Sequence, residues 1–471
     1  MSIKYDGYIL DENYSLMKSP VTMSQAQVYG ISKQNSKEIF QFFQKNFGCT
    51  RKVYNMCVDS CYKQLEQAGY TSGDDLPDIS FPKVAALKKD YPYLKEADGL
   101  GLANSVRDFQ KACKTFRDQK DRSTYRKSAL RRDRSGKELL SFRGLKGIPR
   151  FHAKSAGYFS YRTACQYPKE GNALKRPTIR LEGSILYLPK LKQGVKLIIH
   201  RKLPEDAHIL NVTVFMDTDG TYRVSICYSY TFLMEMDYRE AATQEQPLPK
   251  ETRFLGLDYS QKDLYVDSEG RKANYPKYYK RSEQKLARLQ KSICRKEKNG
   301  KNYQKSMRKI QKLHVKIKHQ RHDYLQKLST ELVSRYDVIV VEDINLRAMG
   351  GCLSLGKNLH DNGFGLFREM LAYKLWKKGS CLVRIDRMYP SSKTCSVCGA
   401  VKQDLKLSDR IYICPECGCF IDRDYNAAVN IREEGKRTFL IYLKEAMEKE
   451  EEAKIRQKAT KERRQKKKKA A

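Results

Sequence analysis

Apolar residues follow two different periods along this chain, and the changes between them mark its segments. From Ser36 onward the apolar positions step by three, four or seven, which predicts a long helix that ends at Gly69. A second helical face runs from Leu102 to Phe116, so residues 36–140 are predicted to form a helical domain. The apolar positions of the first helix are Ile39, Phe43, Phe47, Tyr54, Cys57, Cys61 and Leu65.

Near Gly147 the period changes to two, which is typical of half-buried strands. The pattern predicts an antiparallel, barrel-like β-domain from residues 141–235, and residues 1–35 are expected to supply its first strand. The helical domain is then an insertion in the barrel, and polar residues 236–251 form a linker. The predicted strands are 178–181, 185–188, 195–200, 209–215 and 222–230.

The second half of the chain alternates strands and helices, which predicts an α/β layer over residues 252–388. A basic helical hairpin is expected at 281–334, broken at Asn299-Gly300, and the apolar run 337–346 predicts a buried central strand. Residues 389–420 are interpreted as an inserted finger, 421–435 as the last segment of the layer, and 436–471 as a charged tail, disordered or weakly helical.

The charge of the chain indicates a polyanionic partner. Lys and Arg number 92 against 55 Asp and Glu, a formal net charge of +37, and such an excess repels itself unless phosphates neutralise it. The helical domain is therefore interpreted as contacting nucleic acid, with a plain helical bundle as the alternative. The outer face of the hairpin is either a phosphate-binding surface or the solvated face of a coiled coil.

Fourteen cysteines, most of them widely separated, favour a reducing environment over a disulfide framework. No apolar run approaches the ~20 residues that a membrane helix needs, and the first residues do not resemble a signal peptide. We therefore expect a cytoplasmic protein with no membrane partner.

Two Cys-x-x-Cys pairs, Cys395/Cys398 and Cys414/Cys417, predict a metal site. The fifteen residues between Cys398 and Cys414 fall within zinc-ribbon spacing, and each pair aims two thiolates at one ion. Four thiolates leave no open coordination position, so one structural Zn²⁺ is expected. Cys419 is a spare thiol that could compete for the ion.

Three carboxylates stand at the ends of predicted elements: Asp258 after the first strand, Glu342 after the central strand and Asp424 at the start of the last helix. Separately, each could be a turn cap, a strand-end charge or a helix cap. If they converge, their repulsion calls for divalent cations, and two Mg²⁺ ions about 4 Å apart can hold the attacking and leaving oxygens of a phosphodiester.

The second half of the chain resembles the split RuvC nuclease of TnpB proteins and of the miniature type V CRISPR effectors. The resemblance covers 254–435 and rests on GLDYS (256–260), VVEDINLRAM (340–349), YPSSKTCSVCG (389–399), YICPECG (412–418) and DRDYNAAVNI (422–431). SYRT (160–163) and LPKL (188–191) extend it to the β-domain. The sequence departs from many relatives at Ser260, where they have Gly.

The resemblance implies an RNase H-like (RuvC) nuclease domain with a zinc-ribbon insertion that binds target nucleic acid, a wedge-like β-barrel and a helical recognition domain. It implies Mg²⁺-dependent catalysis at Asp258, Glu342 and Asp424; Asp424 is preferred to Asp422 because the family acid stands two residues before the Asn of NAA. It also implies a guide RNA and a double-stranded DNA target beside a short flanking motif.

The residues that would read the flanking motif are less defined. Thr50, Arg51, Tyr54 and Asn55 interrupt the apolar face of the first helix, and Arg162 lies in SYRT; ordinary helix surface and core is the alternative for the helix residues. A monomer is favoured over a homodimer. A silent RNA-guided binder and a guide-independent transposase or resolvase remain alternative functions.

Overall fold

The computed structural model describes residues 21–469, apart from 74–75, 120, 122, 127–140, 155–158, 169–173, 233–251, 299, 347–360, 379 and 407. The predicted linker, most of the basic run after the second helix and residues 1–20 lie outside the described residues. The chain forms two compact units, one built from 22–231 and the other from 232–471 with the first 21 residues.

The helical part of the first unit is built on two long helices, α1 (Lys37–Gln67) and α3 (Gly99–Arg117). They pack against each other around a core that includes Val53, Leu65 and Phe109. The short elements α2 (Val84–Asp90), η1 (Pro92–Glu96) and η3 (Phe142–Gly144) complete this part. The two long helices agree with the apolar faces that the sequence predicts.

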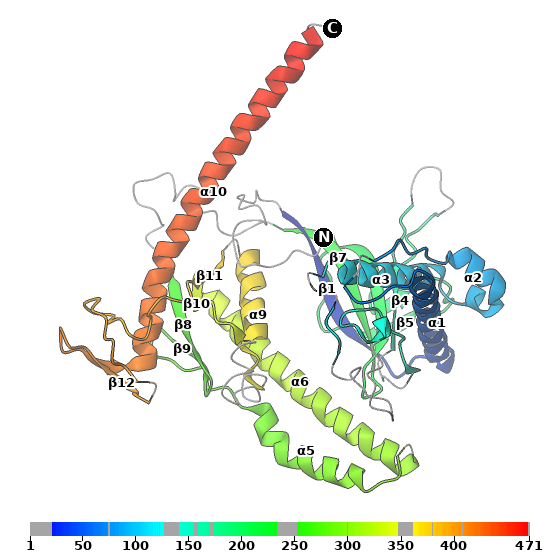
Figure 1. The fold of residues 1–471 in the computed structure, drawn as a ribbon, viewed down its shortest axis with the longest axis horizontal. Coiled ribbons are helices and arrows are strands. Elements are labelled where there is room, and N and C mark those ends of the chain that lie inside the picture. Colours follow the sequence, from blue (N-terminus) through cyan, green and yellow to red (C-terminus); the bar gives the residue numbers. More distant parts are fainter. Residues whose placement is uncertain are drawn as a thin grey trace. The chain divides into compact units, whose positions relative to one another are not determined.

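The same unit contains a seven-stranded sheet that curls into a half-barrel, with the order β2-β6-β7-β1-β5-β4-β3 (Figure 1). The strand that precedes α1 lies inside this sheet and pairs with β5. Its strands are β1 (Val21–Ile31), β2 (Phe159–Ala164), β3 (Arg180–Glu182), β4 (Ile185–Tyr187), β5 (Val195–Ile198), β6 (His208–Met216) and β7 (Tyr222–Phe232).

A four-stranded sheet with the order β11-β10-β8-β9 is the centre of the second unit. Strands β8, β10 and β11 run parallel, and β9 is antiparallel to β8. Their bounds are β8 (Phe254–Ser260), β9 (Leu264–Asp267), β10 (Val338–Glu342) and β11 (Leu382–Ile385).

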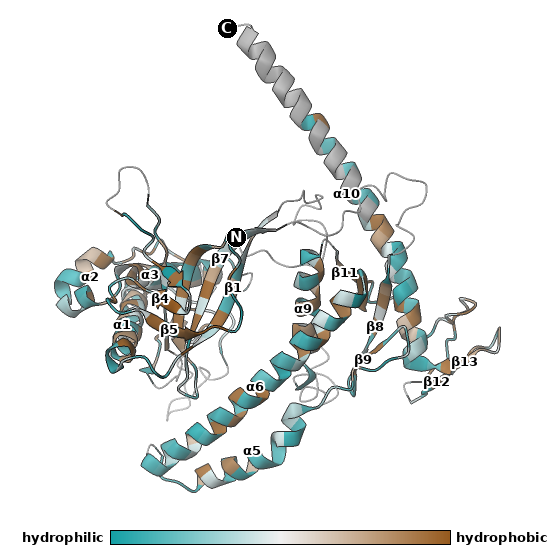
Figure 2. Cartoon of the chain, turned by 180° about the vertical axis from the view of Figure 1, so that it is seen from behind, coloured by the Kyte–Doolittle hydropathy of each residue, from teal (hydrophilic) through white to brown (hydrophobic). Residues whose placement is uncertain are grey.

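Three helices of the second unit follow the sequence pattern. Helices α5 (Tyr278–Cys294) and α6 (Lys301–Arg335) form the predicted hairpin, whose small core contains Leu286, Ile293 and Ile310. Most of the remaining hairpin surface is hydrophilic (Figure 2). Helix α9 (Phe364–Lys377) packs with α6 on one face of the sheet, over Leu257, Val341 and Leu382.

Helix α10 (Arg423–Lys469) covers the other face of the sheet. A β-carbon added at Gly256 would lie 2.2 Å from the carbonyl oxygen of Ala428, and one added at Gly435 would lie 2.3 Å from Cγ1 of Val340. Glycine at these two positions therefore allows the helix to lie directly on β8 and β10. The helix continues to Lys469, so of the two expected states of the tail, disordered or weakly helical, the structure has the helical one.

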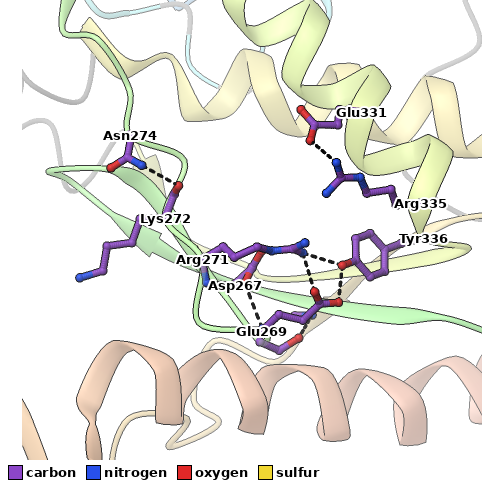
Figure 3. A network of polar contacts seen from close by, with 10 residues as sticks. Asp267, Glu269, Arg271, Lys272, Asn274, Glu331, Arg335 and Tyr336 are labelled. Atoms are coloured by element: carbon purple, nitrogen blue, oxygen red, sulfur yellow. Dashed lines mark hydrogen bonds and ion pairs between the residues drawn. The ribbon is translucent and has the colours of Figure 1, made fainter.

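A polar network fastens the turn after β9 to the end of α6 (Figure 3). Asp267, only 1% exposed, accepts a 2.9 Å bond from Arg271 Nε, and Arg271 also contacts Glu269 and the Tyr336 hydroxyl. Tyr336 lies two residues before β10. The network therefore connects the strand beside β8 to the start of the central strand.

No helix in the described part of the chain is long and apolar enough to cross a membrane.

The close approach at Gly256 predicts a severe effect of a single methyl group. We expect Gly256→Ala to reduce the free energy of unfolding by about 3 kcal/mol, because the atom it meets belongs to the backbone of α10 and cannot move aside alone. Urea denaturation measures the loss. Gly48→Ala, within α1 and with open space around its β-carbon, is the matched control and should stabilise by up to about 1 kcal/mol. A neutral Gly256→Ala would contradict the packing.

Candidate active site and metal centre

Parallel strands β8 and β10 bring the first two candidate carboxylates to one edge of the sheet. Leu257 is in register with Val341, so the next residues on the two strands, Asp258 and Glu342, are neighbours. Side chains alternate between the faces of a strand, and Gly256 and Val340 face α10. Asp258 and Glu342 therefore face α10 as well, at the carboxyl ends of their strands.

The third carboxylate, Asp424, comes from the first turn of α10. The helix touches β8 where Gly256 meets Ala428. Asp258 lies two residues further along the strand, and Asp424 lies one helical turn before Ala428, a step of about 6 Å in each case. The two side chains consequently approach the same point from the strand and from the helix.

The electrostatics of Asp258 reflect this convergence. Burial raises the pKa of Asp258 well above its ordinary value, and the negative charges of Glu342 and Asp424 raise it further, whereas Arg423 lowers it. Burial also raises the pKa of Glu342, which Ser391 partly offsets by donating a hydrogen bond to Oε1. A donor set of carboxylate oxygens suits Mg²⁺, so the residue types present fit such an ion.

The start of α10 separates the roles of its two aspartates. Asp422, the last residue of β13, accepts the backbone N–H groups of Asp424 and Tyr425 at 2.9 and 3.0 Å and so caps the helix. Asp424 makes a 3.2 Å ion pair with Arg423. Asp424 is thus the carboxylate of this pair that acts on the charge state of Asp258. Its catalytic role stays a prediction.

The four cysteines of the predicted zinc site lie together in the ribbon formed around β12 (Ile411–Ile413) and β13 (Phe420–Asp422). All four sulfur atoms lie within 4.8 Å of one another, with Cys395–Cys417 at 3.7 Å and Cys398–Cys414 at 3.5 Å. A tetrahedral zinc with Zn–S bonds of about 2.3 Å needs sulfur atoms about 3.8 Å apart. The cluster therefore fits one Zn²⁺.

Backbone geometry prepares these thiols for an ion. Gly399 and Gly418 adopt φ of +79° and +69° directly after each pair, and their N–H groups donate to the carbonyl oxygens of Cys395 and Cys414, which closes a tight turn around each pair. Hydrogen bonds from the backbone of Cys417 and Glu416 are the main reason that the pKa of Cys414 falls to about 7.

Within the described residues, these four cysteines are the group of possible ligand side chains whose atoms lie close enough together to bind one metal ion. The three carboxylates are not gathered to that degree.

Two buried asparagines join the ribbon to the helix that carries Asp424. The Asn426 amide donates to the Thr394 carbonyl at 2.7 Å and accepts from the Ser396 N–H at 2.9 Å. Asn430 donates to the carbonyl oxygens of Ser391 and Thr394. Because Ser391 itself contacts Glu342, the zinc ribbon, α10 and the central strand meet at the carboxylates.

The residues proposed to contact nucleic acid mostly have internal partners. The Thr50 hydroxyl, in a side chain only 5% exposed, donates to the Asn46 carbonyl at 2.8 Å. Tyr54 stacks on His152 with ring centroids 4.0 Å apart, and Asn55 exchanges two hydrogen bonds with the His152 backbone.

The two arginines of this set differ in what they contact. Arg51 lies over the Phe159 ring, 5.7 Å from its centroid. Arg162 pairs with Asp108 at 2.6 Å, with both side chains about half exposed. These arginines are better placed than Thr50 to meet a phosphate.

Sequence reasoning did not single out Ser391, Arg423, Asn426 or Asn430. Asn426 lies within the NAA motif and Ser391 within YPSSKTC, but nothing local in either motif indicates which carboxylate or backbone group each contacts.

Two families match consecutive parts of the second unit. Residues 232–352 match a transposon family described as "Probable transposase", and residues 364–431 match "Cas12f1-like, TNB domain". The first match contains Asp258 and Glu342, and the second contains the four cysteines and Asp424. The chain is of the TnpB type.

Individual relatives of this TnpB-type chain agree with the family matches. A Streptomyces pristinaespiralis protein named "Putative RNA-guided DNA endonuclease" is 29% identical over 82% of this chain and 84% of its own length. Escherichia coli InsQ, with the same descriptive name, is 28% identical over 72% of this chain and 75% of its own. The CRISPR-associated endodeoxyribonuclease Cas12f1 of Sulfoacidibacillus thermotolerans is 31% identical over 20% of this chain and 21% of its own.

The raised pKa of Asp258 predicts a stability effect that is independent of catalysis. The folded state holds the Asp258 proton more tightly than the unfolded state, so without metal the fold loses stability as pH rises above the ordinary Asp value. In EDTA at pH 7 we expect Asp258→Asn to raise the melting temperature by about 3 °C, the shift that ~1 kcal/mol gives in a domain of this size.

Two further measurements check the cause. The difference should vanish below about pH 3, where the carboxyl is largely protonated in both states, and Mg²⁺ should stabilise the natural protein more than Asp258→Asn. A lower melting temperature for Asp258→Asn in EDTA at pH 7 would show that the ionised carboxylate does not destabilise the folded state.

The cysteine geometry predicts one zinc ion per chain. Elemental analysis of the purified protein should find it, and Cys414→Ser should lose it, because three thiolates bind less tightly than four. The exposed Cys294→Ser is the matched control and should keep a full equivalent. Full zinc content in Cys414→Ser would exclude the four-thiolate site, whereas loss in Cys419→Ser would give the fifth thiol a share in it.

Proposed function

We propose that this protein is an RNA-guided DNA endonuclease. It binds a guide RNA, recognises a short motif beside its target and hydrolyses DNA phosphodiesters at a single site formed by Asp258, Glu342 and Asp424. The observation that carries the proposal is the register of β8 and β10 beneath the first turn of α10, which turns three sequence-distant carboxylates towards one point. The names of the relatives supply the substrate class.

In this proposal the three carboxylates would hold two Mg²⁺ ions. When bound, these ions supply an activated water and stabilise the leaving 3′ oxygen. Ser391 fixes the orientation of Glu342 through its hydrogen bond, and Arg423 holds Asp424 through its ion pair. The chain itself thus positions each oxygen from a rigid element, two from strand ends and one from a helix, and needs no Ser or Cys nucleophile.

The ribbon would have a structural and substrate-binding role. Four thiolates would saturate its zinc, so the ion would hold the fold rather than react. The surface around the ribbon carries Lys402, Lys406 and Arg410, which suit a phosphate backbone.

Target sequence would be read mainly by base pairing with the guide, and the protein would read only the flanking motif. A groove of about 640 Å³ on the helical part of the first unit is the place we assign to that motif. It is lined by Lys52, Asn55, Lys63 and Phe151 among others. It extends the proposed contact set, and it adds cations beside Arg51.

The test of the function combines purification with cleavage. Protein purified with nuclease treatment should retain a discrete RNA, and with Mg²⁺ it should cut a plasmid that carries the matching target. Asp258→Ala should lower the rate by at least about 10³-fold, because it removes an ion ligand rather than a distant contact.

Retained RNA without cleavage by the natural protein would favour a guided binder. Cleavage at full rate with no RNA present would favour a guide-independent nuclease. Asp422→Asn is a useful comparison, since it removes the neighbouring carboxylate that caps α10; it should lose far less activity than Asp424→Asn.

A further inference from the structure

A basic groove begins three residues after Asp258, where the chain leaves β8 and later enters α5. One end is a cavity of about 140 Å³ lined by Gln261, Lys262 and Asn362 together with Tyr275, Lys277 and Lys280. The last three residues also line an open groove of about 520 Å³ that continues to Asn274 and Arg281. The two spaces therefore form one groove.

The lining of the groove is strongly cationic. It contains four cations, Lys262, Lys277, Lys280 and Arg281, and one carboxylate, Asp361. Asp361 is 5% exposed and already has partners: it accepts the N–H groups of Tyr279 and Lys280 at 3.0 and 3.2 Å, and Arg321 lies 3.7 Å away. The Asp361 carboxylate thus caps α5. Because it is already paired, the groove is positively charged through its lysines.

Two details of the groove indicate an anionic occupant. The amide Nε2 of Gln261 is buried and has no hydrogen-bond acceptor in the structure, which is costly unless a ligand provides one. Lys277 and Asn274 both adopt left-handed backbone angles, with φ of 52° and 53°, although neither is glycine. Such strain of about 1 kcal/mol or more per residue persists where surrounding structure enforces it, often at binding sites.

The position of the groove limits which molecule can fill it. Ser260 to Lys262 is at most about 10 Å of chain, so the groove lies next to the edge of the sheet that carries the carboxylates. Asn362, part of its lining, donates to the hydroxyl of Tyr259, the residue after Asp258, at 3.1 Å. A strand running from this groove reaches the carboxylates within a few nucleotides.

We propose that this groove binds the phosphodiester backbone of the DNA strand that is presented to Asp258. This rests on the proposed function and adds a positioning site to it. Lys262, Lys277 and Lys280 neutralise phosphates of the strand beside the cut, and the Gln261 amide donates to one of their oxygens. These are positioning residues, which fix where along the strand the carboxylates act.

The test measures binding without cleavage, so that it does not depend on catalysis. Guide-loaded protein in EDTA is titrated with a fluorescent DNA strand that pairs with the guide over only part of its length, at several NaCl concentrations. We expect K262Q/K277Q/K280Q to bind about tenfold more weakly, with a slope of log affinity against log salt smaller by about 2. K262R/K277R/K280R should restore both.

The matched control removes the same charge from the part of α5 outside the groove. K285Q/R288Q/K291Q changes three exposed side chains of α5 and should alter DNA binding less than twofold. Equal losses of DNA affinity in the two triple variants would overturn the proposed DNA-binding role of the groove. The same conclusion would follow if K262R/K277R/K280R did not restore affinity although its melting temperature was unchanged.

A second measurement locates the phosphate and its source. A neutral methylphosphonate is placed at successive positions of the DNA strand; one position near the cut should weaken binding to the natural protein but not to K262Q/K277Q/K280Q. If the glutamine variant instead loses affinity for the guide RNA while its loaded form binds DNA normally, the groove holds RNA and the DNA assignment is wrong. If DNA binding depends on these lysines but the protein does not cleave DNA, the result would support the groove proposal and contradict the proposed endonuclease function.

Discussion

Repulsion between carboxylates in a buried corner is the constraint around which the second unit is built. Asp258 is partly buried and faces two further acids, so its ionised form is disfavoured by desolvation and by charge at once. Such an arrangement persists only if the elements that carry it cannot move apart. The glycine contacts of α10 with β8 and β10 supply that rigidity, because Gly256 lets the helix backbone lie directly on β8 and Gly435 makes room for the Val340 side chain of β10.

The cysteine ribbon takes part in the same constraint through the segment that precedes its first cysteine. Ser391 stands four residues before the first cysteine and contacts Glu342, while Asn426 and Asn430 bind backbone atoms between Ser391 and Ser396. The thiolate cluster fixes this segment from the other end. Order in the ribbon therefore fixes the orientation of Glu342, so that the cysteine cluster and the carboxylate edge are connected through this segment.

Much of this arrangement could be predicted from sequence because it depends on local signals. The run at 337–346 predicts a buried strand with Glu342 at its end, and the cysteine spacing predicts a ribbon that the structure forms. Thr50 shows where local reasoning stops: a polar residue on an apolar face indicates a surface contact, yet its hydroxyl bonds to the preceding turn of its own helix. The roles of Gly256 and Ser391 likewise depend on segments about 170 and 50 residues away. Periodicity carries no information on such pairs.

The raised pKa of Asp258 also bears on how the site selects its cofactor. A carboxylate that holds its proton tightly binds a cation only by releasing that proton, so proton and Mg²⁺ would compete at the proposed site as pH falls. The groove that begins at Gln261 places lysines near this edge of the sheet. These lysines also attract the phosphates of the strand, and each phosphate that enters brings negative charge to which a divalent ion can bind. Substrate and cation are therefore expected to bind cooperatively, since the site with neither one is the state in which the carboxylates repel most.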